Sequence, residues 1–246
     1  MLRAVVVIPV VRPFLEEAEK VSLSRCLEVL GSWPIVLLSP ADLDLAAIQH
    51  FCGNRAIERR FDPGYFKSIA DYNRLMISAR FYEAFADYDY MLLYQLDAYV
   101  FEDRLAEWCA RGYDYVGAPA LHQGFERLPE GEAAQYAKAL DSHRLVFNGG
   151  LSLRKISAMK RLIKLYNFFF PAWPGNEDML FSLASTRLQP LKPFMKLPQW
   201  RTALEFSFEK SPAASLEITK GKLPFGCHAW EKYDPAFWTA YILDQP

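Results

Sequence analysis

The amino-terminal half of the chain alternates short apolar runs with amphipathic segments, and this alternation constrains its fold more than any other feature. Residues 4–10 and 34–39 are apolar runs of strand length, so they predict buried strands. Between them, residues 14–30 form a segment that predicts a helix ending at Gly31. A helix between two such strands forms a βαβ unit with parallel strands. The sequence therefore predicts an α/β fold with a mostly parallel sheet flanked by helices.

The same alternation continues to residue 118. Further strands are predicted at 55–61, 90–97 and 113–118, and further helices at 41–51, 68–82 and 103–111. Ser68 with Asp71 three residues later forms a capping-box-like start for one of these helices. Open α/β sheets bind ligands beyond the carboxyl ends of their strands, so residues that follow strands are the first candidates for function.

After Ala118 the alternation stops. Residues 119–144 are polar with interspersed glycine and proline and are expected to form a surface excursion. A strand at 145–154, a helix at 155–169 and a helix from Asn176 that ends before Pro190 are predicted next. The rest is rich in proline and aromatic residues and is expected to be irregular chain. We therefore expect the second half to add antiparallel or irregular elements over the carboxyl edge of the sheet.

Length and charge exclude several classes of protein. A chain of 246 residues with 52% hydrophobic residues and a net charge of -1 suits one globular domain, and argues against nonspecific binding of nucleic acid. Four cysteines without a Cys-x-x-Cys pair argue against a zinc site or a disulfide framework and suit the cytoplasm. The first apolar run is short and broken by Pro9, which is unlike a signal peptide or membrane span. No Gly-x-Gly-x-x-Gly or Walker sequence is present.

Three places carry residues suited to chemistry. Asp97 lies at the carboxyl end of a predicted buried strand, two residues after Gln95, and it is either a ligand for a divalent cation on a diphosphate or a turn cap. His228, after Gly226, is either a packed histidine or a metal ligand. Glu177 and Asp178 open a predicted helix, where acidic residues act as caps or as a catalytic pair.

A fourth place combines an amide with two glycines. Asn148, Gly149 and Gly150 lie inside a predicted strand, which glycines weaken. Such a pair marks either a bulge or the close approach of another molecule, such as a sugar ring. Both interpretations remain open on the residues alone.

Taken in order, these motifs resemble one family. They are Gln95-Leu96-Asp97, Phe147–Arg154, Asn176-Glu177-Asp178 and Pro224–His228. Together they resemble a family of glycosyltransferase-like domains with the GT-A fold, and the matches extend from the first strand to His228. The resemblance implies a GT-A, Rossmann-like sheet, a divalent cation (Mn²⁺ or Mg²⁺) at Asp97 and His228, and Asp178 as the catalytic base with Glu177 as an acceptor or orienting contact. The family usually has two aspartates separated by one residue, whereas this chain has Gln95 at the first position.

The resemblance also implies that one half of the chain binds the donor and the other half binds the acceptor. Residues 1–246 form one domain, with a nucleotide-sugar donor half at 1–118 and an acceptor half with a closing segment at 119–246. The expected donor-binding residues are Pro9, Val10, Lys67, Asn73, Arg74, Gln95 and Asp97. The expected acceptor-binding residues are Asn148, Gly149, Gly150, Trp173 and Asn176. Residues such as Lys67 and Arg74 are more often solvated helix residues, and an aromatic residue such as Trp173 more often packs in the core.

The expected function is transfer of a sugar, with inversion, from a nucleotide-diphosphate sugar to a hydroxyl of a saccharide or lipid-linked glycan, as in polysaccharide biosynthesis. Two alternatives are a nucleotidyltransferase and a noncatalytic saccharide-binding module derived from the same fold. The basic residues Lys155, Lys160, Arg161 and Lys164, followed by Phe168-Phe169-Phe170, are compatible with weak peripheral contact with the inner face of a membrane. An ordinary amphipathic helix explains the same residues.

Overall fold

A computed structural model of the chain describes residues 2–121, 137–138, 140–141, 145–171, 173–184 and 195–243. In this part of the chain, six strands form one sheet in the order β3-β2-β1-β4-β7-β6. They are β1 (Ala4–Pro9), β2 (Ile35–Pro40), β3 (Ile57–Phe61), β4 (Tyr90–Tyr94), β6 (Tyr115–Pro119) and β7 (Phe147–Lys155). The predicted boundaries agree with these strands to within a few residues.

The sheet is mainly parallel, as predicted. β1 pairs in parallel with β2 and β4, and β2 pairs in parallel with β3. β7 runs antiparallel to both β4 and β6, so β6 has the same direction as the first four strands. The central strands are buried on both faces, and Val5 to Ile8 of β1 have no exposed surface. Unbroken apolar runs are typical of such doubly covered strands.

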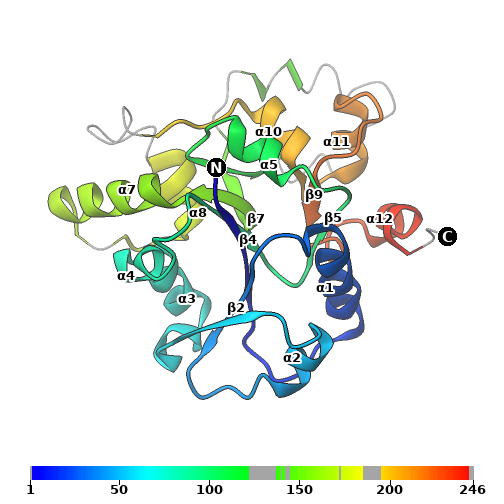
Figure 1. Ribbon diagram of the computed structural model, residues 1–246. Coiled ribbons are helices and arrows are strands. Elements are labelled where there is room, and N and C mark those ends of the chain that lie inside the picture. The colour runs from blue at the N-terminus through cyan, green and yellow to red at the C-terminus, as the bar shows by residue number, and fades with distance from the viewer. Residues whose placement is uncertain are drawn as a thin grey trace.

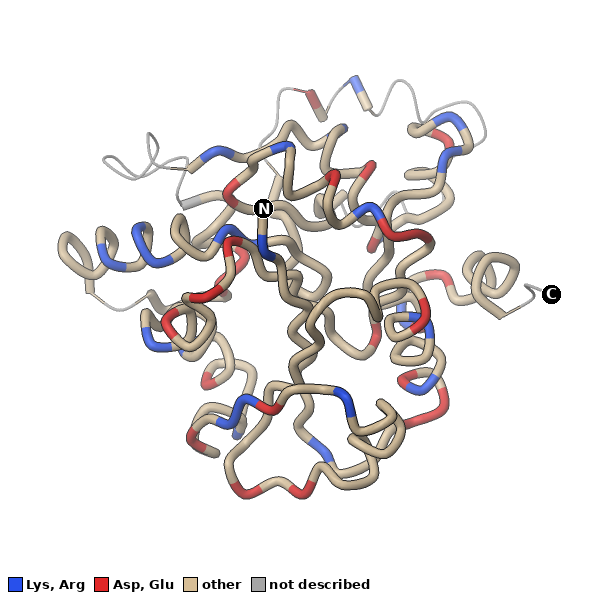
Figure 2. Tube along the Cα trace, in the orientation of Figure 1, with Lys and Arg blue, Asp and Glu red and all other residues tan. Residues whose placement is uncertain are grey.

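Helices cover both faces of the sheet. They include α1 (Glu17–Leu30), α2 (Ala46–Phe51), α3 (Ile69–Met76), α4 (Ala79–Glu83), α5 (Leu105–Ala110) and α7 (Ile156–Phe169). In Figure 1 the sheet is seen nearly edge-on, with α3, α4 and α7 on one side and α1 on the other. Acidic and basic residues are interspersed over these elements (Figure 2), in keeping with the small net charge.

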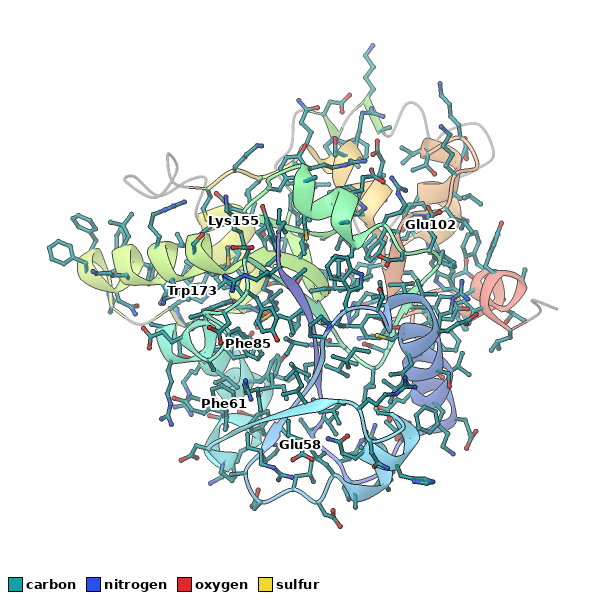
Figure 3. The ribbon with its side chains drawn as sticks, viewed as in Figure 1. Glu58, Phe61, Phe85, Glu102, Lys155 and Trp173 are labelled. Atoms are coloured by element: carbon teal, nitrogen blue, oxygen red, sulfur yellow. The ribbon has the colours of Figure 1, made fainter. Side chains whose placement is uncertain are left out.

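The helix predicted at 68–82 is two helices. Ser68 caps α3 by accepting a hydrogen bond from the amide of Asp71, as the capping-box pattern predicted. A second serine, Ser78, accepts from the amide of Phe81 and starts α4 in a new direction. Serine competes for backbone amides in this way, which is why it ends one helix and begins the next. Pro63–Phe66 form a 3₁₀ helix, and the side chain of Asp62 caps its start by accepting a hydrogen bond from the amide of Gly64. Phe61 and Phe85 (Figure 3) both contact Phe81 in the core beneath α4.

The prediction of an irregular carboxyl-terminal segment was wrong. This segment contains α10 (Trp200–Phe206), β8 (Ser207–Phe208), α11 (Pro212–Ile218), β9 (Gly226–His228) and α12 (Pro235–Ile242). Pro212 and Pro235 stand at the first position of their helices, where a missing amide hydrogen costs nothing. β9 joins β8 and β5 (Ala98–Val100) in a second small sheet in the order β5-β9-β8. β5 and β9 are antiparallel, so the second half does add an antiparallel element.

Two predicted segments lie partly outside the described residues. These are most of the polar stretch 119–144 and the end of the helix expected before Pro190. The described start of that helix is α8 (Glu177–Met179), which continues as a π-helical turn, Leu180–Ala184. Single π turns often occur at functional sites.

The carboxyl-terminal elements close against the first half. The ring of Trp238 stacks on Phe101 with centroids 5.9 Å apart, and Trp230 Nε1 donates to Ser22 Oγ of α1 at 3.0 Å. Cys26, Cys52, Cys109 and Cys227 are buried free thiols. Among the described residues, no helix has the length and apolar character needed to cross a bilayer.

Candidate active site

A pocket lies at the carboxyl ends of β1 and β4. These strands are neighbours, and the sheet extends from them in opposite directions, so this is the switch point where α/β sheets bind ligands. The pocket has a volume of about 310 Å³ and is lined by residues from the end of β1, the start of α1, Tyr72 of α3 and the segment 95–97. Pro9, Val10, Gln95 and Asp97, which the sequence placed at the donor, therefore lie together.

Asp97 and His228 meet although 131 residues separate them in sequence. The chain turns after β4, and β5 then pairs with β9 so that Ala98 lies opposite His228. This places Asp97 Oδ1 3.2 Å from His228 Nε2. Gly226 permits the pairing, because a Cβ there would lie only 2.5 Å from the carbonyl oxygen of Tyr99.

His228 lies between two carboxylates. Its Nδ1 atom is 3.4 Å from Glu209 Oε1, and the residue is buried. Burial lowers the pKa of His228, but the opposing effects of Asp97 and Glu209 outweigh it and raise the pKa to about 9. Burial likewise raises the pKa of Asp97, but hydrogen bonding and charge from His228 lower it below its usual value overall. At neutral pH the free protein therefore holds an imidazolium beside a carboxylate.

Gln95 and Gly150 fix the position of the His228 ring. The side-chain oxygen Oε1 of Gln95 is 3.1 Å from His228 Nε2. The backbone N–H of Gln95 donates to the carbonyl of Gly150 at 2.8 Å. A Cβ on Gly150 would lie 2.0 to 2.5 Å from three atoms of the ring. The absence of a side chain at position 150 therefore makes room for the imidazole itself.

Glu209 was not identified from the sequence. It follows β8, is 5% exposed, and its Oε1 atom accepts from Asn148 Nδ2 at 3.0 Å. Asn148 Oδ1 in turn accepts from the amide of Gly150 at 2.7 Å. No signal in the sequence marks Glu209, because the strand that precedes it has only two residues, which are too few to show a period.

A second acidic cluster lies on the other side of Gly149. A Cβ on this glycine would lie 2.5 Å from Glu177 Oε1. Glu177 is buried, and its Oε1 accepts from Nη2 of Arg154 at 3.0 Å. Arg154 is wholly buried in β7, and it also donates to Tyr82 Oη at 3.2 Å and to the Gly149 carbonyl at 3.2 Å. The sequence alone gives no signal for Arg154, because nothing in its strand marks it as an ion-pair partner.

Asp178 differs from Glu177 in its surroundings. Its Oδ1 atom is buried and has no hydrogen-bond partner. Burial, reinforced by the charge of Glu177, raises the pKa of Asp178 to about 6. Arg154 satisfies Glu177, so the neighbouring carboxylates have different environments, and Asp178 has the pKa suited to proton transfer near neutral pH.

Asn73 and Asn176 connect α3 to the start of α8. Asn73 Nδ2 donates to Asn176 Oδ1 at 3.1 Å, and Asn73 Oδ1 accepts from the amide of Glu177 at 3.2 Å. Asn176 also accepts at its carbonyl from Trp173 Nε1 at 2.8 Å. These contacts position the start of α8, and with it Asp178.

Three predicted donor residues do not line the pocket at β1 and β4: Asn73, which contacts Asn176 and Glu177 instead, Lys67 and Arg74. Lys67 is exposed after the 3₁₀ helix. Arg74 is exposed on α3 and pairs with Asp71 at 2.6 Å. None of the three side chains lines the pocket, so their roles remain predictions.

A divalent cation fits this site in part. Asp97 Oδ1 and Gln95 Oε1 both lie within 3.2 Å of His228 Nε2, and carboxylate, amide oxygen and imidazole are acceptable ligands. The imidazole nitrogen would first have to lose its proton. In the described part of the chain, no group of three or more His, Cys, Asp or Glu side chains is arranged to hold a metal. Open coordination positions would thus have to be filled by water or by a ligand.

The fold is similar to those of solved glycosyltransferases. The galactosyltransferase LgtC, solved with donor and acceptor sugar analogues, has a TM-score of 0.58 and 15% identity, covering 98% of this chain and 94% of that chain. The glycosyltransferase GlyE of Streptococcus pneumoniae TIGR4 has a TM-score of 0.51 and 14% identity. The match covers 100% of this chain and 61% of the GlyE chain. Mouse xyloside xylosyltransferase 1 has a TM-score of 0.50 and 9% identity, and the match covers 92% of this chain and 97% of the mouse chain. This likeness shows the GT-A fold.

Sequence comparisons give a family without an assigned activity. Residues 56–228, well over half of the chain, match the model of the family described as "Protein of unknown function (DUF5672)". Among curated proteins, none matches the chain.

Proposed function

We propose that this chain, which belongs to the DUF5672 family, is a glycosyltransferase that moves a sugar from a nucleotide-diphosphate sugar to a hydroxyl of a saccharide or lipid-linked glycan. The GT-A fold supports a role in sugar transfer. The observation that carries the proposal is the switch-point pocket, which Gln95 and Asp97 line. Asp178, which is not among the lining residues, has a buried Oδ1 atom without a hydrogen-bond partner. An acceptor hydroxyl would supply the missing hydrogen bond.

The donor nucleotide occupies the pocket in this proposal. Its base and ribose lie against Pro9 and Val10, and its diphosphate lies near Asp97 and His228. A divalent cation bound by Asp97 and His228 would neutralise charge on the departing nucleoside diphosphate. Asn148, Gly149 and Gly150 separate this region from the acidic cluster, and Glu177 and the His228 ring occupy the space beside the two glycines.

Asp178 acts as the general base. It takes the proton of the acceptor hydroxyl while the hydroxyl oxygen bonds to the anomeric carbon and the bond from that carbon to the diphosphate breaks. Attack from the face opposite the diphosphate inverts the configuration. Glu177, held by Arg154, orients the acceptor side. Because the base must be ionised, transfer should decline as the pH falls below about 6.

Calorimetric titration tests the donor. Nucleoside diphosphates and nucleotide sugars are titrated into the protein with Mn²⁺ or Mg²⁺ and again with a chelator. Binding of one nucleotide class that strengthens with metal supports both the donor and the cation. Binding that ignores the chelator removes the cation from the proposal. Binding of saccharide but of no nucleotide would instead identify a noncatalytic saccharide-binding module.

Product analysis tests the reaction. Asp178→Asn should reduce transfer by about 10²- to 10⁴-fold, the usual contribution of a general base, while donor binding persists. The matched control is Asp42→Asn, at an exposed position on the loop before α2. Release of a nucleoside diphosphate supports a glycosyltransferase, whereas release of diphosphate would identify a nucleotidyltransferase. Full activity in Asp178→Asn rejects the assigned base.

We also propose that the described elements belong to one domain of residues 1–246 that acts in the cytoplasm in polysaccharide biosynthesis. The four buried thiols suit a reducing compartment.

A further inference from the structure

Helix α7 presents one basic face to solvent. Lys160, Lys164 and Phe168 are spaced four residues apart, so they lie along the same side of the helix. Lys164 and Phe168 are exposed, Lys160 is half-buried, and the exposed Arg161 lies beside them. The opposite side is buried against the protein and consists of Ile156, Ala158, Met159, Leu162, Ile163 and Tyr166. The α7 sequence contains no acidic residue, and Figure 2 shows its lysine and arginine positions.

The carboxyl-terminal end of α7 carries exposed aromatic rings. Phe168 is 79% exposed and Phe169 is 52% exposed, with ring centroids 4.9 Å apart. This end of the helix lies away from the sheet, at the left of Figure 1, and side chains project from it in Figure 3. Tyr166 contacts both Phe170 and Trp173, with ring centroids 5.1 and 5.9 Å apart, and these contacts hold the end in place.

The charges around the exposed face favour an anionic partner. Arg161 lies 3.8 Å from Asp114, a carboxylate that is itself buried. The positive charge on this side of α7, apart from the pair of Arg161 with Asp114, therefore comes from Lys160 and Lys164. Two lysines in line with a projecting phenylalanine match the interface of an anionic bilayer, where ammonium groups meet lipid phosphates and an aromatic ring enters the boundary of the acyl region.

We propose that α7 docks the protein on an anionic lipid surface, with Phe168 and Phe169 inserted and Lys160 and Lys164 on the headgroups. The helix lies along the membrane and does not cross it, which agrees with its buried apolar face being occupied by the protein core. The docking itself is independent of the catalytic assignment.

One consequence rests on the proposed function. Only a short connection separates α7 from the start of α8, and Trp173 in that connection donates to Asn176, which begins the acidic cluster. A docked α7 therefore holds the acceptor side near the membrane. This selects a lipid-linked glycan over a free saccharide as the acceptor class.

Vesicle sedimentation of the full chain tests the docking. Wild-type protein should sediment with phosphatidylcholine vesicles containing phosphatidylglycerol, bind vesicles of phosphatidylcholine alone much less, and dissociate in high salt. Phe168→Ser with Phe169→Ser should lower partitioning about tenfold. Lys160→Glu with Lys164→Glu should also lower it at least about tenfold, since each lysine contributes about fivefold at an anionic surface. Ile69→Ser is the matched control, because Ile69 is 78% exposed on α3, and it should bind as wild type does.

Several outcomes overturn the proposal. These are equal sedimentation with both vesicle types, unchanged binding of either double variant, or loss of binding in the Ile69→Ser control. Absence of vesicle binding together with self-association that disappears in the phenylalanine variant would assign the aromatic end to a protein interface instead. Failure of docking leaves nucleotide binding in solution unaffected, whereas failure of the proposed function removes nucleotide binding and leaves docking intact. The two ideas can therefore be rejected separately.

Discussion

A carboxylate buried beside a second carboxylate holds its proton more tightly, and Asp178 is in that position. Burial first, and Glu177 second, raise its pKa from 3.8 to about 6. The folded state thus favours protonated Asp178, and this contribution to stability is complete below about pH 4 and lost as the pH rises through about 6. Ionisation of Asp178, which the proposed general base requires, therefore lowers the free energy of unfolding.

Replacing this side chain should reveal that cost. We expect Asp178→Asn to match wild type in unfolding free energy near pH 4 and to exceed it by about 2 kcal/mol at pH 8, because asparagine never ionises. Urea denaturation of both proteins at the two pH values provides the measurement. A difference between the proteins that does not change with pH would contradict the burial of a titrating Asp178.

Arg154 should be needed for stability because of the acid that it neutralises. Arg154→Met leaves Glu177 as a buried charge without its cation, so the unfolding free energy should fall by about 3 kcal/mol or more. Glu177→Gln in the same background should restore part of the loss. Arg60→Met, which breaks the surface pair with Glu58, is the control and should cost at most about 1 kcal/mol. Equal losses in the two arginine variants, measured by denaturant titration, would show that the buried pair has no special role.

At the scale of elements, β7 and β9 lie close together because Gly150 of β7 has no side chain where the His228 ring of β9 packs. Gly150→Ala would place a Cβ 2.0 Å from His228 Nε2, so the ring must leave Asp97 and Gln95. We expect a loss of about 1 to 3 kcal/mol in stability and weaker, metal-insensitive donor binding. Gly221→Ala is the control, since its Cβ meets nothing within 4 Å and its positive φ accounts for a stability cost of about 1 to 2 kcal/mol. Calorimetry that finds unchanged donor binding in Gly150→Ala would contradict the assigned position of His228.

Elements with a strong local pattern were predictable. The runs that form β1, β2 and β4 bury every residue or nearly so, and their apolar character is visible without any knowledge of their neighbours. β8 and β9 have two and three residues, which are too few to show a period. Proline, which the sequence analysis took as a sign of irregular chain, instead begins α11 and α12.

Among the residues of the candidate site, too, those with a local sequence pattern were predictable and the others were not. Gln95 and Asp97 could be located because they follow a strand, and His228 because a resemblance pointed to it. Glu209 and Arg154 depend on pairing between distant segments, since β8 must reach β9 and β7 must enter the main sheet before either residue meets its partner. No local pattern contains that information.

At the scale of the whole molecule, the proposed donor and acceptor halves are interleaved. β7 comes from the second half, yet it lies between β4 and β6 of the first half and pairs with both. Trp238 near the carboxyl end is wholly buried against Phe101 in the first half. Neither half can complete its sheet or its core alone, so the two proposed halves are not separate folding units.

This arrangement predicts a single cooperative unfolding transition. Far-ultraviolet circular dichroism reports the whole backbone, whereas tryptophan fluorescence reports sites in both halves, including Trp108 and Trp238. We expect the urea transitions from the two probes to coincide, and residues 1–118 alone to show no cooperative transition, because without β7 the edges of β4 and β6 stay unpaired. Truncation before Pro235 should lower the midpoint of the full-length chain, since it removes Trp238 from the core. Separate transitions, or a stable fragment 1–118, would mean that the first half folds without the strand that joins it to the second.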